Sequence, residues 1–255
     1  MSTEFFLGNK GFKIVNFLHS KELNYFLKNI VDKINLSLKG NKFTIKNLKK
    51  FHKQKISDKE YNNIIISKNR KIKINQSKFL KIFNRSSLKK IVYNYWGHAK
   101  IKIVWVGSAK NNQIENNKVG FRIARPFNSS DAAIEHIDSY NNDDKSFLTI
   151  WIPLIGFSKK YSLKFFPGTH KYKHSTNYFE KKTKYISRVF KKSYVKKFNY
   201  VRPNLKLGQA IIFHPNLIHG GSINEGNYTR ISIEVRIFNK KKYNLKKTFD
   251  KKLVN

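Results

Sequence analysis

Residues 230–237 read Arg-Ile-Ser-Ile-Glu-Val-Arg-Ile and alternate without interruption between polar and apolar side chains. In an extended strand, successive side chains point to opposite faces, so this segment has one polar and one apolar face. The apolar face predicts packing against a hydrophobic layer. The polar face presents a line of groups that begins with Arg230 and Ser232.

Short runs rich in β-branched and aromatic residues fill the second half of the chain, with Gly, Pro, Asn and Asp between them. Besides the strand at 229–238, they cover residues 101–106, 119–125, 147–152, 162–166 and 209–213. Many short strands separated by turn residues indicate an antiparallel sandwich. We therefore expect a mainly β fold, a double-stranded β-helix (jelly roll), over residues 101–238.

The chain begins differently, with a short predicted strand at residues 11–15 followed by a helix. Ser20 is a candidate N-cap of this helix, and Gly40 is a candidate stop. Apolar residues recur between them at the three- and four-residue spacing of an amphipathic helix. They are Leu23, Phe26, Leu27, Ile30, Val31 and Ile34.

Two more helices are predicted before residue 100. Ser57 and Glu60 have capping-box spacing, and a short helix is expected from Ser87 through Tyr95, ending at Gly97. No repeat or linker divides the 255 residues, so we expect one α+β domain. Its parts are a mainly helical N-terminal region (1–100), the jelly-roll core (101–238) with flanking helices, and a basic tail (239–255).

The formal net charge of +38 and the pI near 10.2 are extreme for a chain of 255 residues. A polyanionic partner, such as nucleic acid or a phosphorylated substrate, is one explanation. A general compositional bias is the other, because Lys outnumbers Arg and Asn, Ile, Phe and Tyr are abundant as well. A dedicated nucleic-acid-binding protein more often uses Arg, whose planar fork suits phosphates and bases.

Cysteine is absent, which excludes disulfides, zinc–thiolate sites and thiol nucleophiles. No stretch approaches 18 apolar residues, so no membrane span is expected. Residues 1–12 lack the apolar run of a signal peptide. These features predict a cytoplasmic protein.

His136-Ile137-Asp138 is a candidate metal-binding pair. Residues two apart in an extended segment point the same way, so an imidazole and a carboxylate can bind one ion. Two His and one carboxylate on one face of an octahedron are typical of non-haem Fe(II) oxygenases. Taken alone, the motif favours a surface turn over a metal site.

Three further segments follow in order. The first, residues 148–154, reads Leu-Thr-Ile-Trp-Ile-Pro-Leu, and the second, residues 162–170, reads Ser-Leu-Lys-Phe-Phe-Pro-Gly-Thr-His. The third, residues 207–215, reads Leu-Gly-Gln-Ala-Ile-Ile-Phe-His-Pro and is followed by His219-Gly220-Gly221 and Arg230. With the pair at 136 and 138, this set resembles the phytanoyl-CoA dioxygenase-like family of Fe(II)/2-oxoglutarate oxygenases. The resemblance covers about residues 100–238, with a fainter similarity at 11–34.

The resemblance implies a role for individual residues. His136 and Asp138 match the family's proximal metal ligands, and His219 matches the distal ligand. Arg230, eleven positions after His219, matches the residue that binds the far carboxylate of 2-oxoglutarate, and Ser232 matches a hydroxyl that assists it. His214 competes with His219 for the distal position, but the His-Gly-Gly context and the interval to Arg230 favour His219.

The resemblance also implies the cofactors and the reaction: Fe(II), 2-oxoglutarate as co-substrate, and dioxygen, with release of succinate and carbon dioxide. Halogenating relatives carry a small residue where this chain has Asp138, so hydroxylation is expected. Relatives act on carrier-linked acyl groups, small natural products or sugars, and residues 143–154 look closest to carbohydrate-linked members. A small or carrier-linked substrate bearing a sugar, nucleotide or acyl group is therefore expected, with anionic substrates included.

Two alternatives from other classes stay open at this point. A metal cupin that does not use 2-oxoglutarate would keep the three ligands and would not need Arg230. A non-catalytic polyanion- or nucleic-acid-binding protein would use the Lys-rich surface, and its affinity would fall steeply with salt. The sequence leaves undecided which of Thr149, Trp151, His214 and Arg236 line the pocket.

Overall fold

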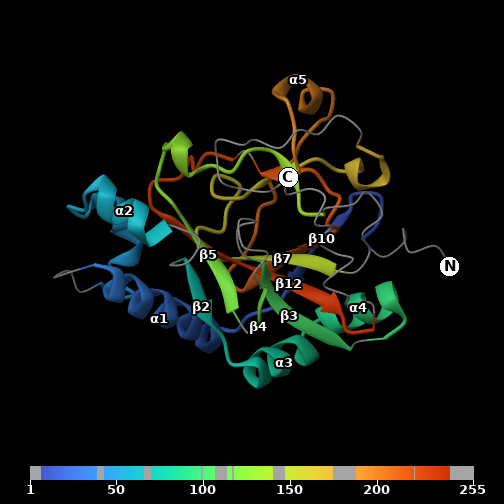
Figure 1. Ribbon diagram of the computed structural model, residues 1–255, viewed down its shortest axis with the longest axis horizontal. Coiled ribbons are helices and arrows are strands. Elements are labelled where there is room, and N and C mark those ends of the chain that lie inside the picture. The colour runs from blue at the N-terminus through green and yellow to red at the C-terminus, as the bar shows by residue number, and fades with distance from the viewer. Residues whose placement is uncertain are drawn as a thin grey trace.

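The computed structural model describes residues 7–38, 43–65, 70–98, 100–106, 114–116, 118–139, 147–174, 188–220 and 222–241. Within these residues the fold consists of two antiparallel sheets with helices around them (Figure 1). The expected mainly β fold of the jelly-roll type with flanking helices is confirmed.

The large sheet has eight strands, and β12 (Arg230–Asn239) lies at its centre. Along one side, β12 pairs with β7 (Phe147–Ile155). Along the other side, its first half pairs with β5 (Lys118–Ala124) and its second half with β3 (Ile101–Val106). Beyond β7 follow β10 (Gln209–Phe213) and then β1 (Phe12–Asn16), while β4 (Ile114–Asn116) pairs with β3 and β2 (Lys71–Lys73) pairs with β5.

The small sheet consists of four strands of two residues each, in the order β8-β11-β6-β9. They are β8 (Lys164–Phe165), β11 (His219–Gly220), β6 (His136–Ile137) and β9 (Arg188–Val189). Phe165 of β8 contacts Phe213 of β10, with ring centroids 5.3 Å apart. Apolar packing between the sheets therefore holds the short strands over the large sheet.

Helices from the N-terminal part of the chain cover one face of the large sheet. Figure 1 shows α1 and α3 on one side of the strands and α5 on the opposite side. The helical elements are α1 (Ser20–Ser37), α2 (Asp58–Ile65), α3 (Gln76–Arg85), α4 (Leu88–Trp96) and α5 (Lys192–Val195), with 3-10 turns at Leu48–Lys53, Ser129–Asp131 and Thr169–Lys171. Buried residues of α1, α3 and α4 form one apolar cluster with strands β5, β7 and β12.

The alternation along β12 determines which of its faces is buried in this cluster. The residues of β12 in this cluster are Ile231, Ile233, Val235 and Ile237, as predicted.

The pairing of β12 with β7 shifts register between Ile231 and Ser232, where Pro153 lies opposite Ser232. Proline has no N–H for the ladder, so an irregularity at this position is expected. Such bulges often lie next to functional sites.

The first predicted helix is confirmed with one correction. All six residues of its apolar stripe are buried. The N-cap is His19 and not Ser20, because Glu22 accepts a hydrogen bond from the His19 backbone N–H (2.6 Å) and completes a capping box. Position 19 escapes a sequence search because His is not a preferred cap residue. The helix ends at Ser37, and Gly40 lies outside the described residues.

The other helical predictions agree with the structure except for one omission. Ser57 and Glu60 form the predicted capping box. Helix α4 follows Ser87 and ends at Gly97, which adopts a left-handed conformation. Helix α3 was not predicted, although Asn75 caps it by accepting from the Lys78 N–H (2.9 Å).

All six predicted strands of the second half are present, with ends displaced by up to three residues. The run at 162–166 is the most reduced, because only Lys164–Phe165 pairs as a strand. Residues 242–255 of the predicted tail lie outside the described residues. No helix in the described part of the chain is long and apolar enough to cross a bilayer.

Two glycines with similar positive φ values provide a test of the close approach between residues 18 and 208. Gly208 (φ +79°) and Gly97 (φ +72°) both lie in the left-handed region. A Cβ at position 208 would collide with the Leu18 carbonyl oxygen, whereas nothing lies within 4 Å of one at position 97. The carbonyl of Gly208 accepts from the N–H groups of both Phe17 and Leu18 (2.9 Å each).

We expect Gly97→Ala to lower the free energy of unfolding by about 1–2 kcal/mol, the cost of a left-handed alanine. Gly208→Ala should lower it clearly further, because the backbone of residues 17–18 must also move. Urea denaturation of both variants measures the difference. Equal destabilisation would contradict the close approach of residue 208 to residue 18.

Candidate metal centre

Two histidines face each other across a pair of strands in the small sheet. His136 of β6 lies directly opposite His219 of β11, with ring centroids 4.3 Å apart. Gly220, with φ +109°, permits this approach, since a Cβ there would lie 2.8 Å from the Ile134 carbonyl oxygen and 3.1 Å from Nδ1 of His136. Glycine after His219 is therefore required by the close packing of the two strands.

The hydrogen bonds of the two rings determine which nitrogen is available to a metal. Nδ1 of His136 lies 2.7 Å from the Ile134 carbonyl oxygen, and Nδ1 of His219 lies 3.0 Å from the Leu217 carbonyl oxygen. A carbonyl only accepts, so each Nδ1 donates its N–H and each Nε2 presents a lone pair. Burial, followed by the nearby His219, lowers the pKa of His136 to about 3, which keeps its ring neutral at neutral pH.

Asp138 supplies the third donor. Its Oδ1 lies 3.8 Å from Nε2 of His136 and 4.0 Å from Nε2 of His219. Each of the three residues offers one donor atom, and these three atoms lie within 4.8 Å of one another. All three residues are buried. The backbone N–H of Asp138 donates to the Pro215 carbonyl (2.9 Å), which connects its loop to the turn before β11.

Two residues of the large sheet hold the carboxylate of Asp138. The Thr149 hydroxyl on β7 donates to Oδ2 (2.6 Å), and Nη2 of Arg236 on β12 donates to Oδ1 (2.8 Å). Burial alone would raise the pKa of this carboxyl, but the Arg236 guanidinium, helped by the Thr149 hydrogen bond, holds the pKa below its ordinary value. Asp138 is therefore ionised, as a metal ligand must be.

The remaining histidines of this region lie outside the cluster. His214 is buried, its Nδ1 accepts from the Asn216 N–H (3.0 Å), and its ring faces Tyr95. His174 is 1% exposed, and its Nε2 and Nδ1 lie 2.9 Å from the Thr169 carbonyl oxygen and 3.0 Å from the Tyr194 hydroxyl. Its ring packs beside Tyr194 of α5, away from the three candidate ligands.

Arg230 is buried at the start of β12, with 2% of its surface exposed. Its Nη1 donates to the Tyr161 carbonyl (3.0 Å), but its Nε has no hydrogen-bond partner, and within the described residues it forms no ion pair. Burial, then repulsion from Arg122 and Arg202, lowers the pKa of Arg230 to about 10, so it stays charged at neutral pH. The hydroxyl of Ser232, two residues on, is also buried without a partner.

These groups fit the two ligands that the resemblance implies. Two imidazoles that each present Nε2 and an ionised carboxylate are the donor set of a facial Fe(II) site. A buried guanidinium and a buried hydroxyl with unsatisfied hydrogen-bonding capacity suit a carboxylate. The roles of Thr149 and Arg236 at Asp138 were left undecided by the sequence. The alternation along β12 placed Arg236 on the correct face without identifying its partner.

Similarities to solved structures agree with this architecture. The carbocyclase SnoK, a non-haem α-ketoglutarate-dependent enzyme from nogalamycin biosynthesis, superposes with a TM-score of 0.54 at 11% identity, covering 94% of this chain and 84% of that one. The epimerase SnoN in complex with Fe3+, α-ketoglutarate and nogalamycin RO gives 0.51 at 13% identity, covering 91% and 80%. AviO1 from Streptomyces viridochromogenes Tue57 gives 0.50 at 12% identity, covering 92% of both chains. At these identities the similarity demonstrates a shared fold.

No curated protein matches the sequence. The family model described as phytanoyl-CoA dioxygenase (PhyH) matches residues 45–232, which contain all three candidate ligands, Arg230 and Ser232. The match spans well over half of the chain and begins further towards the N-terminus than the resemblance seen in the sequence. The chain therefore belongs to the phytanoyl-CoA dioxygenase (PhyH) family and is an oxygenase that depends on iron and 2-oxoglutarate.

Proposed function

We propose that this oxygenase hydroxylates a small or carrier-linked substrate, with His136, Asp138 and His219 as the ligands of Fe(II). The single observation that carries the ligand assignment is the convergence of one ring nitrogen from each histidine and one carboxylate oxygen within 4.8 Å of one another. Both imidazoles are held in the tautomer that a metal requires. Bound iron supplies the dioxygen chemistry, in which 2-oxoglutarate becomes succinate and carbon dioxide and the substrate receives an oxygen atom.

We further propose that Arg230 and Ser232 bind the far carboxylate of 2-oxoglutarate. Both lie on the polar face of β12, and β12 also carries Arg236, which contacts Asp138. Burial around Arg230 excludes water, so a carboxylate there gains a strong charge-assisted hydrogen bond. A carboxylate at position 138 also favours hydroxylation over halogenation, since it occupies the place where halogenating relatives carry a small residue.

Asp138 needs its two supports because it lies on a loop. Thr149 and Arg236 each bind one carboxylate oxygen, and the guanidinium lies over the Phe147 ring at 5.4 Å. We propose that Arg236 and Thr149 are positioning residues that orient Asp138 towards the two imidazoles. Outer partners of metal ligands commonly act in this way.

Family membership excludes the two alternatives that the sequence left open. The family consists of enzymes that use 2-oxoglutarate, whereas one alternative was a cupin that does not use it and the other was a non-catalytic polyanion-binding protein. The single-domain organisation stays a proposal, supported by the apolar cluster shared by the N-terminal helices and the large sheet. The cytoplasmic location also stays a prediction. Of the stretch 143–154, which suggested a carbohydrate-linked substrate, residues 143–146 lie outside the described residues.

His219→Ala should weaken Co(II) or Mn(II) binding by more than the roughly 10- to 100-fold that loss of an outer partner causes, because it removes a ligand. Calorimetric titration of either metal measures the affinity. His214→Ala is the matched control, since His214 is also buried and lies nearby in sequence. The assignment is wrong if the control loses the metal and His219→Ala keeps it.

Arg230→Ala should raise the dissociation constant of 2-oxoglutarate by about 10- to 100-fold, the loss expected for hydrogen bonds to a charged group. Arg230→Lys should recover part of the affinity, because it restores the charge without the fork. Binding is measured on the Mn(II)-loaded protein. Arg85→Ala serves as the control, since Arg85 pairs with Glu22 at an exposed position. Unchanged affinity in Arg230→Ala would remove this residue from the co-substrate site.

Arg236→Met should weaken metal binding by about 10- to 100-fold, and the metal affinity of Arg236→Lys should lie between those of Arg236→Met and the wild type. Thr149→Val preserves the shape of the side chain but removes the hydroxyl, and it should also weaken metal binding. The absorption spectrum of the Co(II)-loaded protein reports ligand geometry independently of turnover. Wild-type affinity and spectrum in Arg236→Met would show that Asp138 is oriented without this guanidinium.

A further inference from the structure

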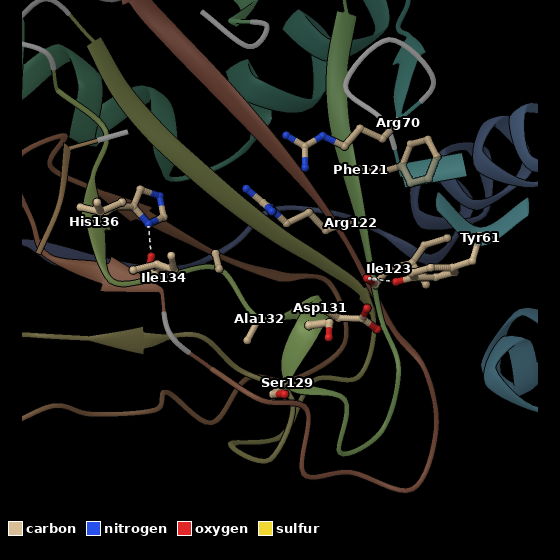
Figure 2. Close-up of a pocket in the computed structure, with 13 residues that line it drawn as sticks. Tyr61, Arg70, Phe121, Arg122, Ile123, Ser129, Asp131, Ala132, Ile134 and His136 are labelled. Carbon is tan, nitrogen blue, oxygen red and sulfur yellow. Dashed lines mark hydrogen bonds between the residues drawn. The ribbon is translucent and has the colours of Figure 1, made fainter. Parts of the chain in front are cut away.

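A cleft of about 270 Å³ begins at His136 and runs along the edge of β5 towards Tyr61. Residues 121–123 of β5 form one wall, and the segment 129–134 forms the other (Figure 2). This edge of β5 is open because its partner β2 ends its pairing at Gly120. A molecule in the cleft would therefore lie next to one of the proposed iron ligands.

Two arginines give the cleft its charge. Figure 2 shows the guanidinium groups of Arg70 and Arg122 pointing from the β5 side of the cleft towards His136. The backbone carbonyl of Arg70 accepts from the Phe121 N–H (2.8 Å), which fixes Arg70 beside the residue that precedes Arg122. The side chain of Arg122 is half-buried and forms no ion pair or hydrogen bond within the part of the chain that the structure describes.

Asp131, the one acidic residue among those that line the cleft, is paired with Arg125 and not with Arg122. Asp131 accepts three hydrogen bonds from Arg125: from its backbone N–H (2.7 Å) and Nε (3.0 Å) on Oδ2, and from Nη2 (3.0 Å) on Oδ1. Its charge is therefore compensated by Arg125. Ser129 and Ser130 add hydroxyl groups at the exposed rim. The lining as a whole is cationic and rich in donors, which suits an anion.

Arg122 is also close to the proposed co-substrate site. It lies opposite Ser232 in the β5–β12 pairing, and its charge contributes to the lowered pKa of Arg230. In the proposed function, one end of 2-oxoglutarate binds at the metal and the other at Arg230. Arg122 is then available to a second anion that lies between the co-substrate and the cleft.

We propose that this cleft binds the substrate, and that the substrate carries a carboxylate or phosphate group held by Arg122, with Arg70 adding positive charge. This inference rests on the proposed function, because it assigns Arg230 to the co-substrate. The cleft holds a small anionic molecule or the anionic end of a larger, carrier-linked one. The anion anchors the substrate so that a neighbouring carbon faces the metal.

The test uses the full chain loaded with Mn(II) and saturated with 2-oxoglutarate. Inorganic phosphate, acetate and acetamide are titrated separately, acetamide being the neutral match of acetate. We expect the wild type to bind phosphate or acetate and not acetamide, and the preferred anion identifies the substrate's charged group. Arg122→Gln should raise the dissociation constant of that anion by about 10-fold, as expected for the loss of a charge-assisted hydrogen bond, and leave the 2-oxoglutarate dissociation constant unchanged.

Each other outcome rejects the proposal. Failure of the wild type to bind either anion, or equal binding by Arg122→Gln, would show that the cleft has no anion site at Arg122. A large rise in the 2-oxoglutarate dissociation constant in Arg122→Gln would assign Arg122 to the co-substrate instead. Failure of the wild type to bind Mn(II) and 2-oxoglutarate at all would reject the proposed function itself. Arg85→Gln, at an exposed pair on α3, controls for the general loss of an arginine.

Discussion

Asp138 accepts a hydrogen bond from Thr149 on β7 and another from Arg236 on β12. Asp138 directly follows β6 of the small sheet, so two strands of the large sheet hold a residue adjoining the small one. The small sheet contributes the two histidines, and its strands are too short to position side chains alone. The clamped carboxylate therefore connects the sheets at the place where the donors meet. An ionised group at this depth is tolerated because both of its oxygens are hydrogen-bonded and a guanidinium compensates its charge.

The strand β12 organises the chemistry around this point. Its apolar side chains are buried in the cluster beneath the large sheet, while its polar side chains follow one another towards the metal centre. Arg236 contacts Asp138, and Arg230 lies near the other end of the strand beneath Tyr161. A single extended segment therefore spans the distance from the metal ligands to the proposed carboxylate site. The irregular pairing opposite Pro153 falls between these two arginines.

The lysines and the arginines that make up the large positive charge differ in their burial. Among the described residues, Arg70 and Arg230 are buried, whereas no lysine is. Arginine tolerates burial because its charge is delocalised and its donors are arranged in a fixed fork. The exposed lysines agree with a compositional bias of the chain. The arginines around the cleft are the part of the charge that points to a specific anion.

Local patterns identified most of the scaffold but not every element. The apolar stripe of α1, the capping box at Ser57 and the glycine stop at Gly97 are short-range features, and each was readable in the sequence. Helix α3 was overlooked although Asn75 marks its start. His19 acts as a cap only because Glu22 reaches its N–H, and His174 is buried only because α5 packs beside it.

The strand alternation, the His-x-Asp pair and the interval from His219 to Arg230 depend on neighbours along the chain, so they are visible in the sequence. The folded chain brings His219 against His136 while His214 lies outside the cluster, joins Arg236 to Asp138, and places Arg122 at the border of a cleft. Residues 138 and 236 are almost a hundred positions apart, and their contact arises from the packing of one sheet on the other. No short-range preference of the chain encodes such a contact.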